Sequence, residues 1–75
     1  MAGRKAVLLI GDMDCASDCP IIEKTLKKKD GVIGVTVNFV TEKMYIRYDD
    51  KRLSLGEIEN EIKRLGYTDI ILKNA

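Results

Sequence analysis

The densest group of metal-ligand side chains in this sequence lies between residues 13 and 20, which are Met-Asp-Cys-Ala-Ser-Asp-Cys-Pro. Within six successive positions stand two thiols and two carboxylates, those of Asp14, Cys15, Asp18 and Cys19. Thiolates are preferred ligands of soft and borderline metal ions, and Zn(II) and its neighbours also accept carboxylate oxygen. The segment therefore predicts a site for one heavy-metal ion in which Cys15 and Cys19 are the primary ligands.

The chain around these cysteines favours their metal-binding form. Proline suits the first turn of a helix, so Cys19-Pro20 predicts a helix start. A helix N-terminus carries partial positive charge and unpaired N–H groups, which stabilise a thiolate relative to a thiol. A first helical turn that reached back to Cys15 would place both sulfur atoms on one side, and a loop would also bring them together. Both arrangements stay open.

Each of these residues also has an ordinary structural interpretation. One cysteine would then be an inert core residue. Asp14 would be a solvated turn residue and Asp18 the cap of the following helix. A second chemical interpretation is a thiol redox element, in which Cys15 and Cys19 form a reversible disulfide, but the pair lacks the Cys-x-x-Cys spacing of thioredoxin-type proteins.

The composition narrows the classes of function. Residues 1–75 form a single domain that is too small for a deep, enclosed active site, so we expect no enzyme in this domain alone. The sequence has no histidine, which removes the commonest general base and the commonest nitrogen ligand. Thirteen basic and twelve acidic residues leave a net charge of +1, which argues against nucleic acid as the main partner.

No segment suggests membrane insertion or export. The longest apolar run, residues 6–10, is too short to cross a bilayer and too poorly flanked to be a secretory signal. Two cysteines are too few for a secreted domain stapled by disulfides. We therefore expect a cytoplasmic protein, or the cytoplasmic domain of a membrane transporter, with no direct membrane contact by this segment.

Hydrophobic periodicity predicts six elements in the order strand, helix, strand, strand, helix, strand. Residues 5–10 form an apolar run that predicts a first strand buried on both faces. Ser54 and Glu57 fit a capping box at the start of the second helix, and Gly66 supplies its C-terminal stop. The other expected elements are a helix from Cys19-Pro20 to Asp30-Gly31 and strands at residues 32–39, 44–48 and 70–72.

This order of elements packs as a four-stranded antiparallel sheet with both helices on one face, which is the ferredoxin-like α+β architecture, βαββαβ. RNA-binding and small-ligand modules share that architecture, but RNA binding needs exposed aromatic side chains on the central strands. The alternation of side chains places Phe39 and Tyr48 inward. We therefore expect no nucleic-acid binding.

Residues along nearly the whole chain, from about Val7 to Leu72, follow one known pattern. They are Met13-Asp14-Cys15, Ile22-Glu23, Leu26, Gly31-Val32, Val35, Val37-Asn38, Thr41, Tyr48-Asp49, Ile62 and Leu65-Gly66-Tyr67. In these residues the chain resembles the heavy-metal-associated domain, found in copper chaperones and at the N-termini of metal-transporting P-type ATPases. The resemblance implies the ferredoxin-like fold, a metal ion on the exposed first loop, and transfer of that ion by ligand exchange with another metal-transfer domain or a transporter.

The chain departs from this family at the second cysteine. The family has Gly-Met-x-Cys-x-x-Cys, whereas here Cys19 stands one position later and Asp18 occupies the usual place. The step from Cys15 to Ile22 is the one found in the family, so no residue has been inserted before the helix. The glycine is displaced as well, to Gly11. These changes argue against the usual two-coordinate copper geometry.

The residues around the first cysteine bear on the choice of metal. The Met-Asp-Cys form resembles the zinc, cadmium and lead branch of the ATPase domains, in which the aspartate at the position of Asp14 is a ligand. Asp18 adds a second carboxylate. We therefore expect one Zn(II), Cd(II) or Pb(II) ion held by Cys15, Cys19, Asp14 and Asp18, with Cu(I) as the alternative.

The resemblance also implies positions near the ion for Met13 and Tyr67. The corresponding methionine packs inward beneath the site, and the alternative for Met13 is a soft ligand. A residue of the loop after the second helix lies close to the metal loop, and the alternative for Tyr67 is partial burial in the core. Two chains that shared one ion through their cysteines would form a metal-bridged homodimer.

Overall fold

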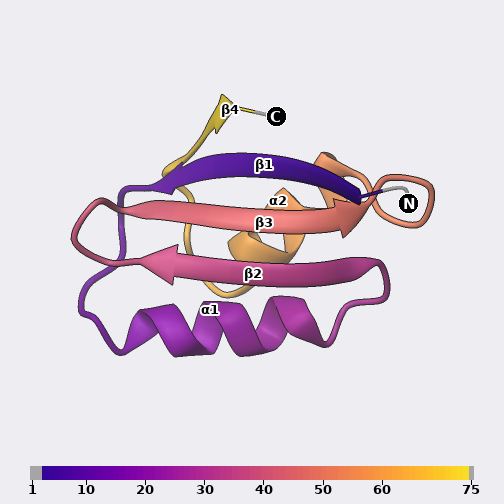
Figure 1. The fold of residues 1–75 in the computed structure, drawn as a ribbon. Coiled ribbons are helices and arrows are strands. Elements are labelled where there is room, and N and C mark those ends of the chain that lie inside the picture. Colours follow the sequence, from indigo (N-terminus) through magenta and orange to yellow (C-terminus); the bar gives the residue numbers. More distant parts are fainter. Residues whose placement is uncertain (1–2, 75) are drawn as a thin grey trace.

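The computed structural model describes residues 3–74. Its elements follow the predicted order of strand, helix, strand, strand, helix, strand (Figure 1). Each helix has ten residues, and within the described residues no helix is long and apolar enough to cross a membrane. The elements are β1 (Gly3–Ile10), α1 (Asp18–Lys27), β2 (Val32–Asn38), β3 (Lys43–Asp49), α2 (Leu55–Arg64) and β4 (Ile70–Asn74).

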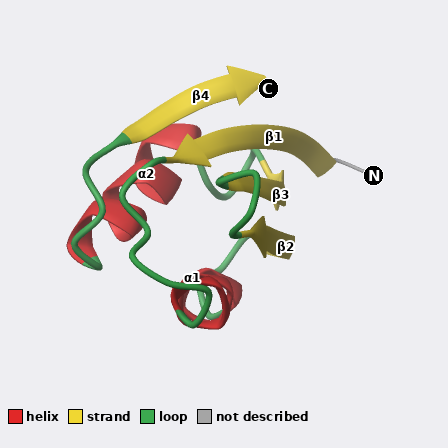
Figure 2. Cartoon of the chain, turned by 90° about the vertical axis from the view of Figure 1, so that its left-hand side faces the viewer, coloured by secondary structure: helices red, strands yellow, loops and turns green. Residues whose placement is uncertain are grey.

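The four strands form one sheet in the order β2-β3-β1-β4, and every neighbouring pair is antiparallel. Both helices lie on the same side of this sheet (Figure 2). The arrangement is the ferredoxin-like α+β architecture and confirms the predicted fold. Ile10, the last residue of β1, pairs with Ile70, the first of β4, and its N–H donates to the carbonyl of Glu42 in the β2–β3 turn. Three loops therefore meet at one end of the sheet.

The core lies between the sheet and the two helices. Alternate strand residues point toward the helices, so every second side chain is buried from Ala6 to the end of β1 and from Met44 to Tyr48 in β3. Burial of each large aliphatic side chain contributes roughly 1.5–3 kcal/mol. The largest fully buried side chains are Leu8, Ile10, Ile22, Leu26, Met44, Ile58 and Ile62.

The prediction that β1 is buried on both faces is wrong. Ala6, Leu8 and Ile10 are buried on the helix-covered side, whereas Val7 and Leu9 on the other side remain partly exposed. The reason is that both helices pack on one face, so the described chain supplies no layer for the other. An apolar run alone does not distinguish these two situations.

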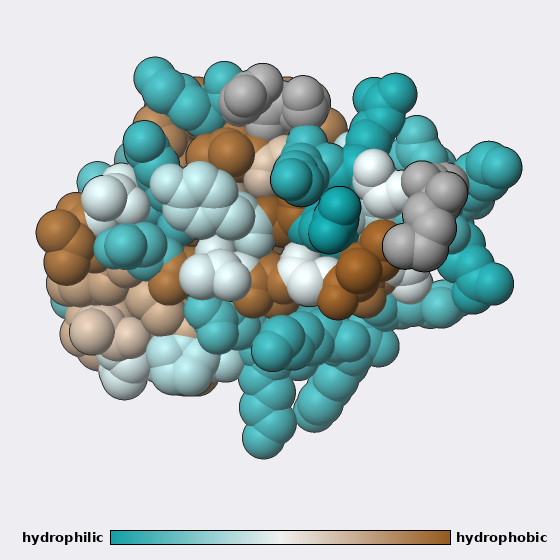
Figure 3. All heavy atoms as spheres, in the orientation of Figure 1, coloured by the Kyte–Doolittle hydropathy of each residue, from teal (hydrophilic) through white to brown (hydrophobic). Residues whose placement is uncertain are grey.

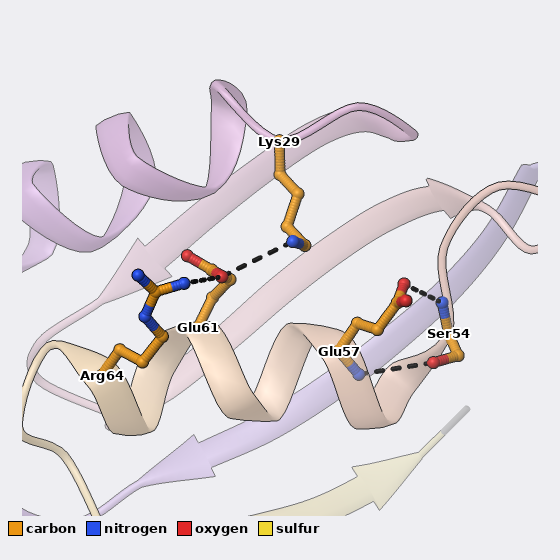
Figure 4. A network of polar contacts seen from close by, with 5 residues as sticks. All are labelled: Lys29, Ser54, Glu57, Glu61 and Arg64. Atoms are coloured by element: carbon orange, nitrogen blue, oxygen red, sulfur yellow. Dashed lines mark hydrogen bonds and ion pairs between the residues drawn. The ribbon is translucent and has the colours of Figure 1, made fainter.

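The start of α2 has the predicted capping box. The Ser54 hydroxyl accepts from the Glu57 N–H and the Glu57 carboxylate accepts from the Ser54 N–H, each at 3.3 Å (Figure 4). Further along the same helix, Glu61 contacts Arg64 at 3.1 Å and Lys29 at 3.5 Å (Figure 4). Lys29 follows α1, so this pair joins the end of one helix to the middle of the other.

Gly31, between α1 and β2, has a backbone conformation and a close contact that both favour glycine. Its φ of +100° is unfavourable for residues with a side chain, and an added Cβ would lie 2.9 Å from the Cβ of the buried Leu53. We expect Gly31→Ala to lower the free energy of unfolding by about 1–3 kcal/mol, because it combines backbone strain with a steric clash. Urea denaturation followed by circular dichroism measures this.

Two glycines serve as matched controls for that substitution. Gly66 has a φ of +108° but open space around its added Cβ, and Gly34 has open space and no positive φ. Gly66→Ala should therefore cost less than Gly31→Ala, and Gly34→Ala should stay within about 0.5 kcal/mol of the parent protein. Equal stability of the three variants would contradict the account.

Candidate metal centre

The loop between β1 and α1, residues 11–17, is here called the metal loop. Its first residues form hydrogen bonds with the loop that precedes β4. The Gly11 N–H donates to the Asp69 carbonyl at 2.9 Å, and the Thr68 N–H donates to the Asp12 carboxylate at 2.9 Å. A Cβ on Gly11 would overlap the side-chain carboxylate of Asp69, so a larger residue here would require that side chain to move. The loop before β4 thus fixes the first turn of the metal loop.

Met13 lies beneath the metal loop as part of the core. Its side chain is 7% exposed and belongs to the same buried cluster as Leu8 and Ile22. This burial agrees with the inward packing expected for it and leaves its thioether away from the exposed surface. Met13 therefore anchors the loop to the sheet through apolar contact.

Asp18 holds the following part of the metal loop. Its carboxylate oxygen Oδ2 accepts from the Asp14 N–H at 2.8 Å and from the Cys15 N–H at 3.3 Å. The hydrogen bond from the Asp14 N–H lowers the pKa of the Asp18 carboxyl. Bonds from the Cys15 N–H and the Tyr67 hydroxyl add to this lowering, and partial desolvation opposes it. Asp18 was considered as the N-cap of the helix. It is instead the first residue of α1, and its side chain accepts from N–H groups of the preceding loop.

Tyr67 reaches the metal loop from the loop that follows α2. Burial raises the pKa of Tyr67 to about 12, and the hydrogen bond to the Asp18 carboxylate and its negative charge act in the same direction. Its hydroxyl is therefore protonated at neutral pH and lies near the Asp18 carboxylate. Tyr67 is partly buried and packs against the core.

The two cysteines have different surroundings. Cys15 is exposed, and its Sγ lies 2.8 Å from the Ser17 hydroxyl oxygen, which can donate to the sulfur once Cys15 is a thiolate. Cys19 is only 8% exposed. Burial raises the pKa of the Cys19 thiol, and the negative charges of Glu23, Asp18 and Cys15 raise it further. Both thiols are unpaired in the structure.

The burial of Cys19 follows from its place on α1. The buried residues of this helix are Cys19, Ile22 and Leu26, at spacings of three and four. That spacing marks one face of a helix, here the face toward the sheet. Asp18, one position earlier, is rotated by about 100° and is only partly buried.

The four residues considered as ligands do not form one cluster. Within residues 3–74, no three Cys, Asp or Glu side chains are arranged so that they could hold a metal ion together. The Asp14 side chain is exposed, and one oxygen of Asp18 is occupied by backbone N–H groups. Of the four groups, the Cys15 thiol and the Asp14 carboxylate are exposed, whereas the Cys19 thiol is buried.

Sequence reasoning missed two contributors to this region. Ser17 contacts Cys15, and Glu23 accepts from the Val37 N–H at 2.7 Å, which joins α1 to β2. A serine two residues after a cysteine is a usable signal for the first contact. No local pattern indicates the second, because Val37 lies on another element fourteen residues away.

The sequence was compared with known protein families and with known proteins. The sequence model of the heavy-metal-associated domain matches residues 7–68. The copper-exporting P-type ATPase of Bacillus subtilis (strain 168) is 36% identical over 63 residues, which are 84% of this chain and 8% of that protein. The copper-exporting P-type ATPase of Staphylococcus haemolyticus (strain JCSC1435) is 36% identical over 72 residues, 96% of this chain and 9% of that protein. The chain thus spans less than a tenth of the length of these relatives.

Solved structures give the same result. The Cu(I)-loaded N-terminal domain of a potential copper-translocating P-type ATPase from Bacillus subtilis superimposes with a TM-score of 0.89 at 35% identity, covering 96% of this chain and 89% of that one. Oxidized MerP from Ralstonia metallidurans CH34 reaches 0.89 at 25% identity, covering 97% and 100%. The CopZ metallochaperone reaches 0.83 at 25% identity, covering 91% and 100%. On this evidence the chain belongs to the heavy-metal-associated domain family.

Proposed function

We propose that this domain binds one Cu(I) ion through Cys15 and Cys19 and passes it to the thiolates of another metal-transfer domain or of a transporter. One observation supports the proposal. Neither thiol forms a disulfide, whereas the Asp18 carboxylate already accepts hydrogen bonds from two N–H groups of the metal loop. Cu(I) is soft and needs no oxygen ligand in addition to two thiolates. The relatives named for copper support the same ion.

This choice revises the expected preference for Zn(II), Cd(II) or Pb(II). Those ions require further ligands besides two thiolates. Asp18 would have to give up its bonds to the Asp14 and Cys15 N–H groups to supply one. The relatives favour copper over these ions. Asp14, whose side chain is exposed, is the remaining candidate for an oxygen ligand.

Transfer follows from the different exposure of the two cysteines. An incoming thiolate forms a metal–sulfur bond on the exposed side, the bond to Cys15 breaks, and Cys15 regains a proton; the bond to Cys19 breaks last. The oxidation state of the ion does not change, and the domain acts as a carrier. In a longer protein it would be the N-terminal domain of a metal-transporting ATPase, and alone it would be a metallochaperone.

Metal competition tests the choice of ion. We expect the reduced, oxygen-free protein to take one equivalent of Cu(I) from a competing chelator and to hold Zn(II) and Cd(II) much more weakly. Cys15→Ser and Cys19→Ser should each lower the Cu(I) affinity by more than the roughly 10–100-fold that changes outside the ligand set cost. Asp14→Asn is the matched control and should leave Cu(I) affinity unchanged.

Three results would contradict this proposal. Tighter binding of Zn(II) or Cd(II), weakened by Asp14→Asn, would restore the carboxylate-assisted site. Absence of metal binding together with a reversible disulfide between Cys15 and Cys19 would indicate a redox element. A complex of two chains with one ion, seen by sedimentation, would indicate a metal-bridged homodimer.

Substitution of Asp18 tests whether its carboxylate acts on the loop. Asp18→Ala removes the acceptor for the Asp14 and Cys15 N–H groups, so we expect faster hydrogen exchange of these two amides and a lower free energy of unfolding, as for a lost cap. The Cu(I) affinity should fall by roughly tenfold or more, as for residues that orient a ligand. Amide exchange by NMR and the chelator titration measure both effects.

X-ray absorption separates the positioning role from direct coordination. In the Cu(I) complex of Asp18→Ala, the metal should keep two sulfur neighbours and lose no oxygen neighbour. Tyr67→Phe removes the hydroxyl that lies near the Asp18 carboxylate and should produce a smaller change in the same amides. An oxygen ligand that is present in the parent protein and disappears in Asp18→Ala would identify Asp18 as a metal ligand instead.

A further inference from the structure

The face of the sheet opposite the helices is uncovered in the described chain (Figures 1 and 2). Its outward positions carry an apolar strip made of Val7, Leu9, Tyr45 and Ile71. Val7 stands opposite Tyr45 and Leu9 stands opposite Ile71 in the strand register, so the four side chains are contiguous across β3, β1 and β4. Tyr45 is 46% exposed and Ile71 is 55% exposed. Exposed apolar side chains that gather in this way indicate contact with a partner.

A hollow of about 290 Å³ lies beside this strip. Its cause is Gly34 on β2, which has no side chain and nothing within 4 Å of the position of a Cβ. The hollow is bordered by Val7, Thr36, Tyr45 and Arg47, which come from three neighbouring strands. It is therefore a depression on the same surface, of a size that accepts a side chain from outside.

The charged residues at the outward positions are nearly all basic. They are Lys5 on β1 and Lys43 and Arg47 on β3, whereas the one carboxylate there, Asp49, lies 3.8 Å from Arg52. This face therefore carries more basic than acidic side chains, although the whole chain has a net charge of only +1. In Figure 3, which views this face, hydrophobic and hydrophilic side chains are interspersed over the strands.

The basic residues lack counter-charges within the described chain. Lys5 stands directly opposite Arg47 on the neighbouring strand, an arrangement that is destabilising for like charges. None of the ion pairs among the described residues includes Lys5, Lys43 or Arg47. A partner with carboxylates would remove this repulsion, so it would gain from charge complementarity as well as from apolar contact.

We propose that the uncovered face of the sheet is a docking surface for an acidic protein segment that also carries aliphatic side chains. Carboxylates of the partner pair with Lys5, Arg47 and Lys43, and an aliphatic side chain enters the hollow beside Tyr45. Single-stranded nucleic acid fits the face less well, because it offers one aromatic ring, whereas recognition of bases on such a sheet uses two or three. The surface is separate from the metal loop, so docking leaves Cys15 accessible.

The proposal is tested with an eight-residue peptide of glutamate and leucine, as long as β1, added to the ¹⁵N-labelled protein. We expect amide shifts confined to the outward rows of β1 and β3. Lys5→Glu/Arg47→Glu should weaken binding by about tenfold or more. Lys27→Glu/Lys28→Glu is the matched control, because it reverses two exposed charges at the C-terminal end of α1, and it should change the affinity by less than about twofold.

Two further measurements separate specific docking from general attraction of charges. Tyr45→Ala keeps every charge and should also weaken binding, and a peptide with serine in place of leucine should bind more weakly. Circular dichroism and Cu(I) uptake check that each variant is folded and keeps its metal loop. Equal loss in both double variants, or shifts outside this face, would overturn the proposal. Tighter binding of an eight-nucleotide oligouridine than of the peptide would assign the face to nucleic acid and would also overturn it.

Discussion

The structure depends on the burial of apolar side chains against one face of a four-stranded sheet. A chain of 75 residues has enough large aliphatic residues for one such layer, and Leu8, Met44 and Ile62 are among those that fill it. Because both helices contribute to that layer, the other face stays open and the outward residues of β1 stay partly exposed. The core also fixes where the chain leaves the sheet. Three loops consequently converge at one end, where the metal loop lies.

Beyond the last strand pair at that end, Ile10 and Ile70, polar contacts between loops hold the chain together. The Gly11 N–H donates to the Asp69 carbonyl, and the Asp12 carboxylate accepts from the Thr68 N–H. These contacts join residues more than forty positions apart in the sequence. The metal loop therefore depends on the docking of the segment after α2, and its order is a tertiary property of the folded domain.

The sequence predicts what local chemistry determines and fails where the answer depends on distant groups. The capping box of Ser54 and Glu57 was predictable because both partners lie within one turn. The position of Asp18 was predictable, but its role was not, because the role depends on the N–H groups of an irregular loop and on Tyr67, 49 residues later. The error on β1 has the same origin, since an apolar run does not specify how many layers will cover it.

The displaced second cysteine gains a physical meaning from the helix. The buried stripe of α1 runs through Cys19, Ile22 and Leu26, so moving a thiol from position 18 to position 19 turns it toward the core. The position left behind holds Asp18, which braces the metal loop. The two thiols consequently differ in exposure: Cys15 is exposed and Cys19 is buried. In the carrier function that we propose, Cys19 would hold the ion longest and the exposed Cys15 would exchange it with the thiolates of a partner.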